Sequence, residues 1–322
     1  MKNELALGVA VLLCACGAPS PATDAGTDAG EVIAAPGAGD ARTLVGSFSL
    51  LHLVNDGTNA AASLFGKVSD GPTPAALVWE LDTADGDCQL LTPRVPFCAT
   101  PCGGSAVCVE DGVCQPYATS KPLGLVHVTG VLASVESFDM SPINNGYQPP
   151  AGVTLSVPPF SDGQEVVLAA RGSAAVQTFS LTSRGVAPLA FTGATLNLQT
   201  GTPLELTWTP GLASTAARLE VKLDISHHGG TRGMVTCDTA DDGALTISST
   251  LVTKLLNLGV SGFPTVVLRR EKVGSALITA GRVDLVVASE LEQAVSIPGL
   301  TSCTDTAQCP MGQTCQNDLR CN

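Results

Sequence analysis

A repeated cysteine spacing constrains the fold of this chain more than any other feature of its sequence. Residues 102–114 and 309–321 each hold three cysteines with five residues between neighbours, and Cys98 and Cys303 precede these two sets. Segments this short contain too little apolar material to fold by burial alone. Disulfides that restrict the unfolded chain would compensate, so we expect two small disulfide-rich units.

A metal site is the alternative use for such cysteines. Structural zinc sites favour cysteine pairs separated by two to four residues. Within the repeats the separation is five, and no histidine lies nearby. We therefore predict no metal and no cofactor, and we assign the cysteines to disulfides, which form and persist in oxidising compartments.

The amino terminus indicates such a compartment. Lys2 precedes the apolar run LALGVAVLL, which is too short to span a bilayer as a helix but suits the core of a signal peptide. The stretch LCAC at residues 13–16 resembles the lipobox of bacterial lipoproteins. That resemblance implies that residues 1–15 are removed as a lipoprotein signal peptide and that Cys16 is the lipid attachment site. Gly17, where an aspartate would signal inner-membrane retention, implies the outer membrane, on its periplasmic or surface-exposed side. An ordinary signal peptide cut nearby is the alternative.

Residues 16–43 consist mainly of Ala, Gly, Pro, Thr and Asp, with almost nothing to bury. This composition predicts a disordered tether. Its repeated TDAG is similar to the linkers of lipoproteins, which supports the anchor. The chain as a whole resembles uncharacterised bacterial outer-membrane lipoproteins, and that resemblance implies no particular activity.

The number of cysteines limits how they can pair. Loss of Cys14 with the leader and lipidation of Cys16 reduce the twelve cysteines of the chain to ten. These ten are Cys88, Cys98, Cys102, Cys108, Cys114, Cys237, Cys303, Cys309, Cys315 and Cys321. The tail holds four of them, enough for two internal bridges, whereas the region before residue 115 holds five. We therefore expect Cys237 to bridge to one of those five, with Cys88 favoured because it lies outside the tight repeat.

Alternating apolar and polar residues predict a chain built mostly from β-strands. In ARLEVKLDIS, the aliphatic residues from Leu219 to Ile225 fall on one face and the charged residues from Arg218 to Asp224 on the other. That pattern is typical of a strand between core and water. PLELTWTP alternates in the same way, with Trp208 inward. Further strand patterns are GSFSLLHLV, ALVWEL, LGLVHVTGVL, EVVLAA, QTFSL, TVVLRR, ALITA and RVDLVVA.

One helix is expected near residue 251. Leu251, Val252 and Leu255 recur at helical spacing after hydroxyl residues that can cap the start, and Gly259 suits a left-handed residue at the end. The predicted fold class is therefore mostly β, with antiparallel β-sandwich-like regions, one short helix and disulfide-rich segments.

These signals divide the chain beyond the tether into three parts. We expect a β-rich domain over residues 44–188 with a cysteine-rich insert at 88–114, and a cysteine-rich tail over 301–322. Between them, LTWTPG, an alternating strand, CDTADDG and LTIS resemble immunoglobulin-like or fibronectin-like modules of bacterial surface proteins. That resemblance implies an immunoglobulin-like β-sandwich over residues 189–300.

The charge of the chain limits its partners. With 16 basic and 29 acidic residues, the formal net charge is −13, and the sequence has no basic stripe. This argues against nucleic acid as a partner, and an anionic membrane surface would repel the body. The lipid anchor is therefore the expected contact with the membrane.

The stretch SHHGG is the strongest candidate for chemistry. Adjacent histidines on a strand point to opposite faces, although a loop could bring His227 and His228 together. A polar turn without a catalytic role is the other interpretation. DTADGD and DTADDG lack the spacing and the closing Glu of an EF-hand, which favours ordinary turns over calcium loops. His52 and His127 lie in apolar strand patterns, so we expect them to be buried or at an edge.

Together these patterns predict a non-enzymatic, lipid-anchored protein of the cell envelope. Its β-sandwich body would serve a structural, adhesive or partner-binding role, with an unknown envelope or surface protein as the partner. We assign no catalytic residue. A hydrolase or metal-dependent enzyme that uses His227 and His228 is one alternative, and a lipoprotein that binds a small solute is another.

Overall fold

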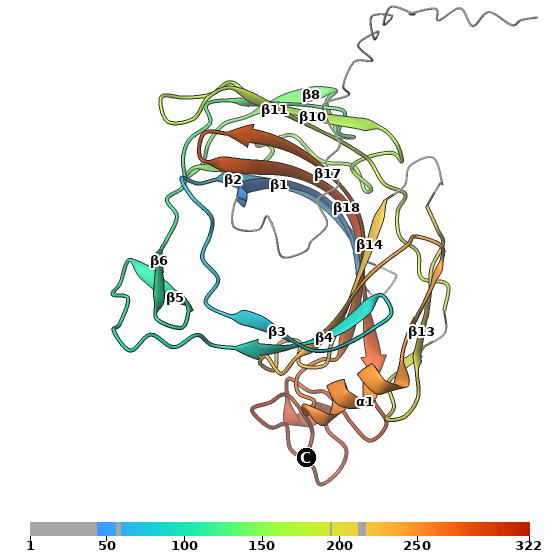
Figure 1. Ribbon diagram of the computed structural model, residues 1–322. Helices are drawn as coiled ribbons and strands as arrows, with labels where there is room; N and C mark the ends of the chain where they lie inside the picture. The colour runs from blue at the N-terminus through green and yellow to red at the C-terminus, as the bar shows by residue number, and fades with distance from the viewer. Residues whose placement is uncertain (1–43, 56–58, 194, 212–216) are drawn as a thin grey trace, which may run out of the picture.

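The computed structural model describes residues 44–55, 59–193, 195–211 and 217–322 (Figure 1). The expected signal peptide, the lipid attachment site Cys16 and the tether over 16–43 lie outside these residues. The described chain is mostly β with one short α-helix, as the alternation predicts. No helix within it is long and apolar enough to cross a membrane.

A ten-stranded sheet forms the centre of the molecule. Its strands, in spatial order, are β3 (Val78–Asp85), β4 (Cys88–Arg94), β15 (Met234–Thr239), β14 (Arg218–Asp224), β17 (Thr265–Ile278), β18 (Gly281–Ser296), β1 (Leu44–Asn55), β2 (Asn59–Val68) and β9 (Gly146–Tyr147), with β12 (Leu196–Asn197) also paired to β18. Figure 1 shows this main sheet curling into an arc, from β1 and β2 through β14 to β3 and β4. It therefore has a concave and a convex face.

The two halves of the chain meet within the main sheet. β1 runs parallel to β18, with Phe48 opposite Leu285, and β4 runs antiparallel to β15. The expected division at residue 188 therefore does not separate two sheets, because strands from both sides of it are hydrogen-bonded neighbours. Alternation specifies which face of a strand is buried but not which strand it pairs with, so the sequence pattern could not find this arrangement.

A second sheet covers the convex face at one end of the arc. It has four strands in the order β11 (Phe179–Arg184), β10 (Glu165–Ala170), β7 (Val126–Thr129) and β8 (Ser137–Met140). Aliphatic and aromatic side chains from both sheets, including Phe48, Leu50, Leu168 and Leu285, form one buried core between them. This packing of sheet on sheet is the predicted sandwich-like arrangement.

A smaller layer covers the convex face at the other end. It consists of the strand pair β13 (Leu204–Thr207) and β16 (Ala244–Ile247) with helix α1 (Ser249–Asn257), packed over β4, β14, β15 and β17. The Ser248 side chain caps α1 by accepting a hydrogen bond from Leu251 N, and Gly259 follows the helix with φ +89°, as expected.

Two disulfide-rich units complete the fold. The first is the hairpin of β5 (Ala106–Glu110) and β6 (Val113–Pro116), which projects from the arc in Figure 1. The second is the tail, which contains one turn of 3₁₀ helix, η2 (Thr306–Gln308), and whose Asp318 O accepts a hydrogen bond from Gly262 N at 2.7 Å. Among the described residues, packed layers thus cover much of the convex face, and no such layer covers the concave face.

Candidate functional site

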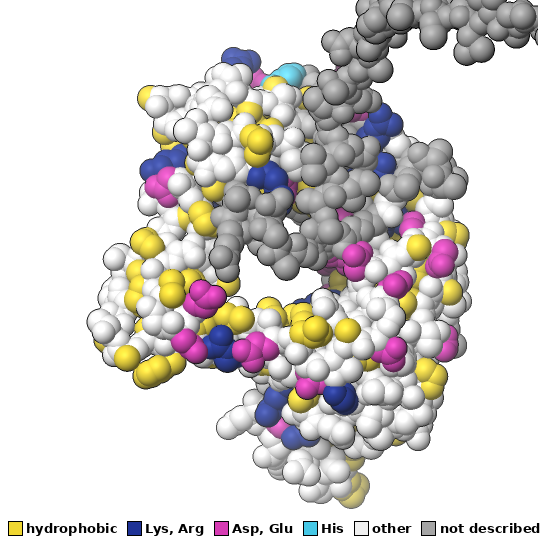
Figure 2. All heavy atoms as spheres, in the orientation of Figure 1, with side chains coloured by type: hydrophobic (Ala, Val, Ile, Leu, Met, Phe, Trp, Pro, Cys, Tyr) yellow, Lys and Arg dark blue, Asp and Glu magenta, His cyan; other side chains and the backbone are white. Residues whose placement is uncertain are grey.

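The concave face of the main sheet holds an open groove of about 650 Å³. Its lining comes from β4, β14, β15, β17, β18 and adjoining turns. The lining residues are Asp87, Gln89, Leu91, Glu220, Val221, Lys222, His227, Met234, Thr236, Cys237, Asp238, Val267, Arg269, Glu290 and Glu292. Figure 2 shows the hollow at the centre of the molecule, with acidic side chains on both sides of it.

Strand alternation explains why charged side chains reach the groove. The aliphatic positions of β14 are buried in the convex core, so Glu220 and Lys222 point to the concave side. The strand register places Asp238 opposite Glu220, Glu220 opposite Arg269, and Arg269 opposite Glu290. A charged row therefore crosses four adjacent strands. The sequence predicted that this face of β14 would be polar, but not that it would line a groove.

The cations of the groove are held by carboxylates. Arg269 lies 2.6 Å from Glu271 and 2.9 Å from Glu290, and Lys222 Nζ lies 3.4 Å from an Asp224 oxygen. Burial alone would lower the pKa of Arg269, but its ion pairs with Glu271 and Glu290 outweigh that effect and raise the pKa above its usual value. Arg269 is therefore a fixed positive charge within a predominantly acidic lining.

The two histidines lie together in the turn after β14. Their ring centroids are 3.9 Å apart, so the turn escapes the opposite-face geometry of a strand. His227 lines the groove, with Nε2 3.7 Å from Glu292 Oε1, and the backbone of His228 is left-handed at φ +63°. The structure thus places one of the two candidate histidines at the groove.

The first of the two glycines that follow the histidines, Gly229, has a packing role. A Cβ on Gly229 would lie 2.3 Å from Gly262 N, and a Cβ on Gly262 would lie 2.0 Å from His227 O. Phe263 N also donates a hydrogen bond to His227 O at 2.8 Å. Close approach of two backbones therefore explains Gly229 of SHHGG, while Gly230 adopts φ +114°, a conformation that favours glycine.

The disulfides join the ten predicted cysteines in five pairs. These are Cys88–Cys237, Cys98–Cys108, Cys102–Cys114, Cys303–Cys315 and Cys309–Cys321. Cys88 and Cys237 lie directly opposite each other on β4 and β15, with 149 residues of sequence separation and a Cα–Cα distance of 4.0 Å. This bridge is the pairing that the cysteine count favours.

The same disulfides bear on metal binding. In the described ranges, potential metal-ligand atoms from three or more residues come within 4.8 Å of one another only among cysteines. The two sets are Cys98, Cys102 and Cys108, and Cys303, Cys309 and Cys321. Every one of these sulfurs is in a disulfide and so offers no thiolate to a metal.

The two disulfide-rich units share one design. In each, the first cysteine pairs with the third and the second with the fourth. Between the third and fourth, Asp111-Gly112 in the first unit corresponds to Asp318-Leu319 in the tail, and the second residue of each turn is left-handed, at φ +76° and +60°. Gly112 adopts this conformation freely, whereas Leu319 is strained.

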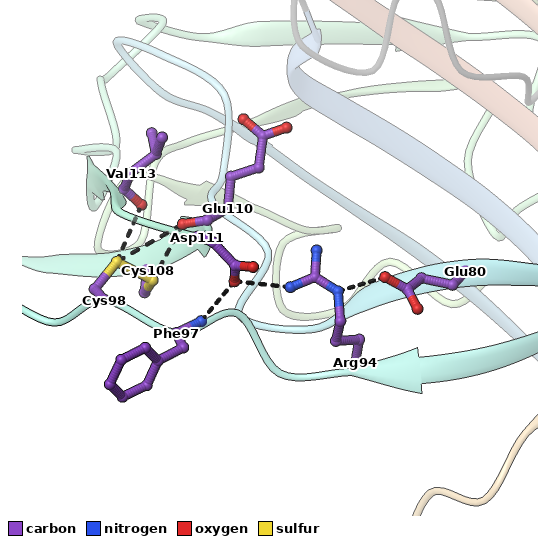
Figure 3. A network of polar contacts seen from close by, with 8 residues as sticks. All are labelled: Glu80, Arg94, Phe97, Cys98, Cys108, Glu110, Asp111 and Val113. Carbon is purple, nitrogen blue, oxygen red and sulfur yellow. Dashed lines mark hydrogen bonds and ion pairs between the residues drawn. A yellow bond between two sulfur atoms is a disulfide. The ribbon is translucent and has the colours of Figure 1, made fainter.

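Polar contacts fix the first unit to the end of β4. Arg94 bridges Glu80 and Asp111, with a distance of 2.8 Å to the latter, and Asp111 Oδ1 accepts a hydrogen bond from Phe97 N at 2.9 Å (Figure 3). The Phe97 ring points away from this network, and 73% of the residue is exposed. The first disulfide-rich unit therefore projects from the main sheet, is held in place by these polar contacts, and does not contribute to the lining of the groove.

A buried ion pair gives a structural role to Asp241 in DTADDG, the second of the two stretches considered above as calcium loops. Arg270 is 1% exposed and donates two hydrogen bonds of 2.7 Å to Asp241, which also accepts from Trp208 Nε1 at 2.8 Å. Burial alone would raise the pKa of Asp241, but the hydrogen bonds from Arg270 and Trp208 outweigh it and keep the pKa below its usual value. The Asp241 carboxylate thus links the smaller layer on the convex face, the one that contains β13 and β16, to β17.

The two remaining histidines lie away from the groove. His52 is buried as expected, with Nδ1 3.2 Å from Ser289 Oγ, and burial lowers its pKa. His127 lies on interior strand β7 but is only half-buried, beside Asp139 at 2.7 Å. The expectation of a buried or edge position for His127 is therefore wrong, because its side of β7 faces away from the core.

Sequence reasoning missed most residues of the groove. Arg269, Glu290 and Glu292 were not among the candidates, although Glu290 and Glu292 stand two residues apart in a strand that also contains the aliphatic run from Leu285 to Ala288. Two charges on the same face of a long apolar strand are the signal that could have found them. No protein-family model and no curated protein matches this sequence.

Proposed function

We propose that the chain is a non-enzymatic, lipid-anchored envelope protein that binds a partner in the groove on the concave face of its main sheet. Of the structural, adhesive and partner-binding roles, the groove favours the last. It is the observation that carries the proposal, because among the described residues packed layers cover the other face of the sheet and leave the groove on this one open.

The composition of the lining supports binding rather than catalysis. Its described residues include no serine or tyrosine, its one cysteine is in a disulfide, and its cations are paired with carboxylates. Covalent hydrolysis usually needs a nucleophile within hydrogen-bond reach of a general base, and no hydrogen bond joins Thr236, the one hydroxyl residue of the described lining, to His227. The groove therefore offers a partner a concave shape and charged side chains, which are features of a binding surface.

The lipid anchor rests on the lipobox resemblance at residues 13–16 and draws support from the five disulfides, which suit an exported protein. Labelled palmitate should enter the mature wild-type protein and not the Cys16→Ser variant. Mature wild-type protein without label would contradict the anchor.

A photo-cross-linking residue tests the groove as a binding surface. Placed at Gln89, an exposed position of the lining, it should give a light-dependent adduct with one envelope component in intact cells. The matched control is Thr182, exposed on β11 in the outer sheet. Adducts from both positions, or from neither, would contradict the proposal.

His227 beside Glu292 is the one observation that favours the enzyme alternative, since an imidazole and a carboxylate in a groove can exchange protons. Hydrolysis of an ester or peptide panel by the wild type, lost in His227→Ala, would establish that alternative. Equal activity of the two proteins, or none in either, agrees with a binding role.

A further inference from the structure

We infer that two copies of this chain associate through the outer edge of strand β2, which pairs antiparallel with the β2 strand of the second copy. The inference goes beyond the proposed function and does not depend on what the groove binds. Three features of β2 lead to it: its unpaired backbone groups, its lack of charge, and the exposed apolar side chains beside it.

The outer edge of β2 is open over residues 59–65. Strand β9 pairs with β2 only at Gly66 and Lys67, toward the other end of the strand. Among the residues that the structure describes, no strand pairs with the outer edge between Asn59 and Phe65. The pairing of β2 with β1 is regular over this length, without a bulge. β2 therefore presents a regular edge on which another strand can pair.

Alternate residues of this open segment direct their backbone groups outward. Ser69 N, just after β2, donates a hydrogen bond to Val45 O on β1 at 2.8 Å. Val68 O points the other way and accepts a hydrogen bond from Lys121 N at 2.9 Å. Because the backbone groups of successive strand residues point to opposite sides, the even-numbered residues of β2 point away from β1. Those in the open segment are Ala60, Ala62 and Leu64, whose N–H and C=O groups suit pairing with a further strand.

The two ends of the main sheet differ in charge. Strand β3, at the opposite end from β2 in Figure 1, carries Glu80, Asp82 and Asp85, and its register shifts between Leu81 and Thr83. Charges and irregular register are features by which edge strands avoid pairing with another chain. The open segment of β2, NAAASLF, has neither.

The charge of the whole chain makes a second copy the occupant that this edge suits. With a net charge of −13, two copies repel each other over most of their surfaces, and an uncharged strand lets them approach. Two β2 strands bring no like charges together, whereas two β3 strands would oppose their carboxylates. A two-fold axis perpendicular to the sheet then makes the contact self-complementary and leaves both concave faces on the same side.

The side chains fit the antiparallel register in which Ala62 lies opposite its own copy. In that register Phe65 lies opposite Asn59 of the second copy, so the largest side chain of the segment meets a small polar one. Phe65 is 52% exposed, and Ile143, in the turn before β9, is 57% exposed. A Cβ on Gly146 would lie 3.2 Å from the Phe65 ring, so this ring and that turn are neighbours. Pairing of the two edges removes part of this apolar surface from water.

Sedimentation velocity of the full chain in density-matched detergent tests the inference. We expect a monomer–dimer equilibrium at micromolar concentration. In the register centred on Ala62, Ala61 of one copy faces Ser63 of the other, and both positions are exposed. Ala61→Glu/Ser63→Glu places like charges opposite each other in two symmetry-related pairs and should weaken the dimer about ten-fold. Ala61→Lys/Ser63→Glu places opposite charges there and should leave the dimer at least as tight as in the wild type.

A matched control adds the same charge elsewhere. Ser180 and Thr182 are exposed and lie two residues apart on β11 of the outer sheet. Ser180→Glu/Thr182→Glu should therefore leave the dimer unchanged. The near-ultraviolet circular dichroism of each variant must match the wild type, so that a loss of dimer is not misfolding.

Four results would overturn the inference. These are a monomer at every concentration, a dimer unchanged by Ala61→Glu/Ser63→Glu, equal weakening by the β11 control, and loss of the dimer in Ala61→Lys/Ser63→Glu. In intact cells, a photo-cross-linking residue at Ala61 should give an adduct with twice the mass of the chain. An adduct with a different envelope component alone would assign the edge to another partner and contradict the dimer.

Discussion

Removal of the Cys88–Cys237 bridge should lower the stability of the protein more than removal of any other disulfide that the structure contains. The bridge closes a loop of 149 residues, for which the chain-entropy model gives about 5 kcal/mol at 25 °C. The Cys309–Cys321 bridge in the tail closes 12 residues, for which the same model gives roughly 3 kcal/mol. We therefore expect the Cys88→Ala/Cys237→Ala variant to lose nearly twice as much unfolding free energy as Cys309→Ala/Cys321→Ala.

Equilibrium unfolding in guanidinium chloride without reductant, followed by far-ultraviolet circular dichroism, measures both values. The denaturant slope should also rise in the Cys88→Ala/Cys237→Ala variant, because its unfolded chain is less compact. A loss below about 1 kcal/mol, or one no larger than that of the tail variant, would refute the reasoning that this bridge constrains the whole sheet.

Three other perturbations have definite signs. His52 has a lowered pKa in the fold, so its contribution to stability is present above about pH 6.5 and is lost as the pH falls through the pKa of the folded state. In thermal unfolding at a series of pH values, His52→Asn should remove the loss of stability that His52 causes below about pH 6.5. Arg270→Met leaves the Asp241 carboxylate buried without its partner and should cost about 3–5 kcal/mol by denaturant unfolding. Leu319→Gly copies Gly112 of the first disulfide-rich unit and should slow hydrogen exchange in residues 301–322 by stabilising that unit by about 1 kcal/mol.

Local patterns were enough to predict the elements. The alternation around Leu219, the hydroxyl cap before Leu251 and Gly259 after the helix all depend on neighbours in sequence, and the structure has each feature where the pattern places it. A count of cysteines assigned Cys237 to a partner among the five before residue 115, and the position of Cys88 outside the tight repeat favoured the bridge that the structure has. These inferences depend on neighbouring residues or on the number of cysteines, and both can be obtained from a single sequence.

Long-range pairing could not be predicted. The parallel contact between β1 and β18 joins segments more than 200 residues apart, as in the pair of His52 with Ser289, and no local pattern selects one partner for a strand. The groove lies on the concave face of the sheet that this pairing helps to build. Arg269 and Arg270 illustrate the limit. The alternation of a strand places them on opposite faces, but only the fold shows that Arg269 lines a groove and that Arg270 forms a buried ion pair.

Methionine oxidation in intact envelopes tests the central claim, occupancy of the groove, most directly. Met234 lines the groove, Met311 is fully exposed in the tail, and Met140 is buried, so the chain carries its own controls. We predict that Met234 is oxidised more slowly in the envelope than in the purified protein, while the rate at Met311 is the same in both and Met140 stays unreactive. Equal oxidation of Met234 in the two settings would contradict a groove that binds a partner.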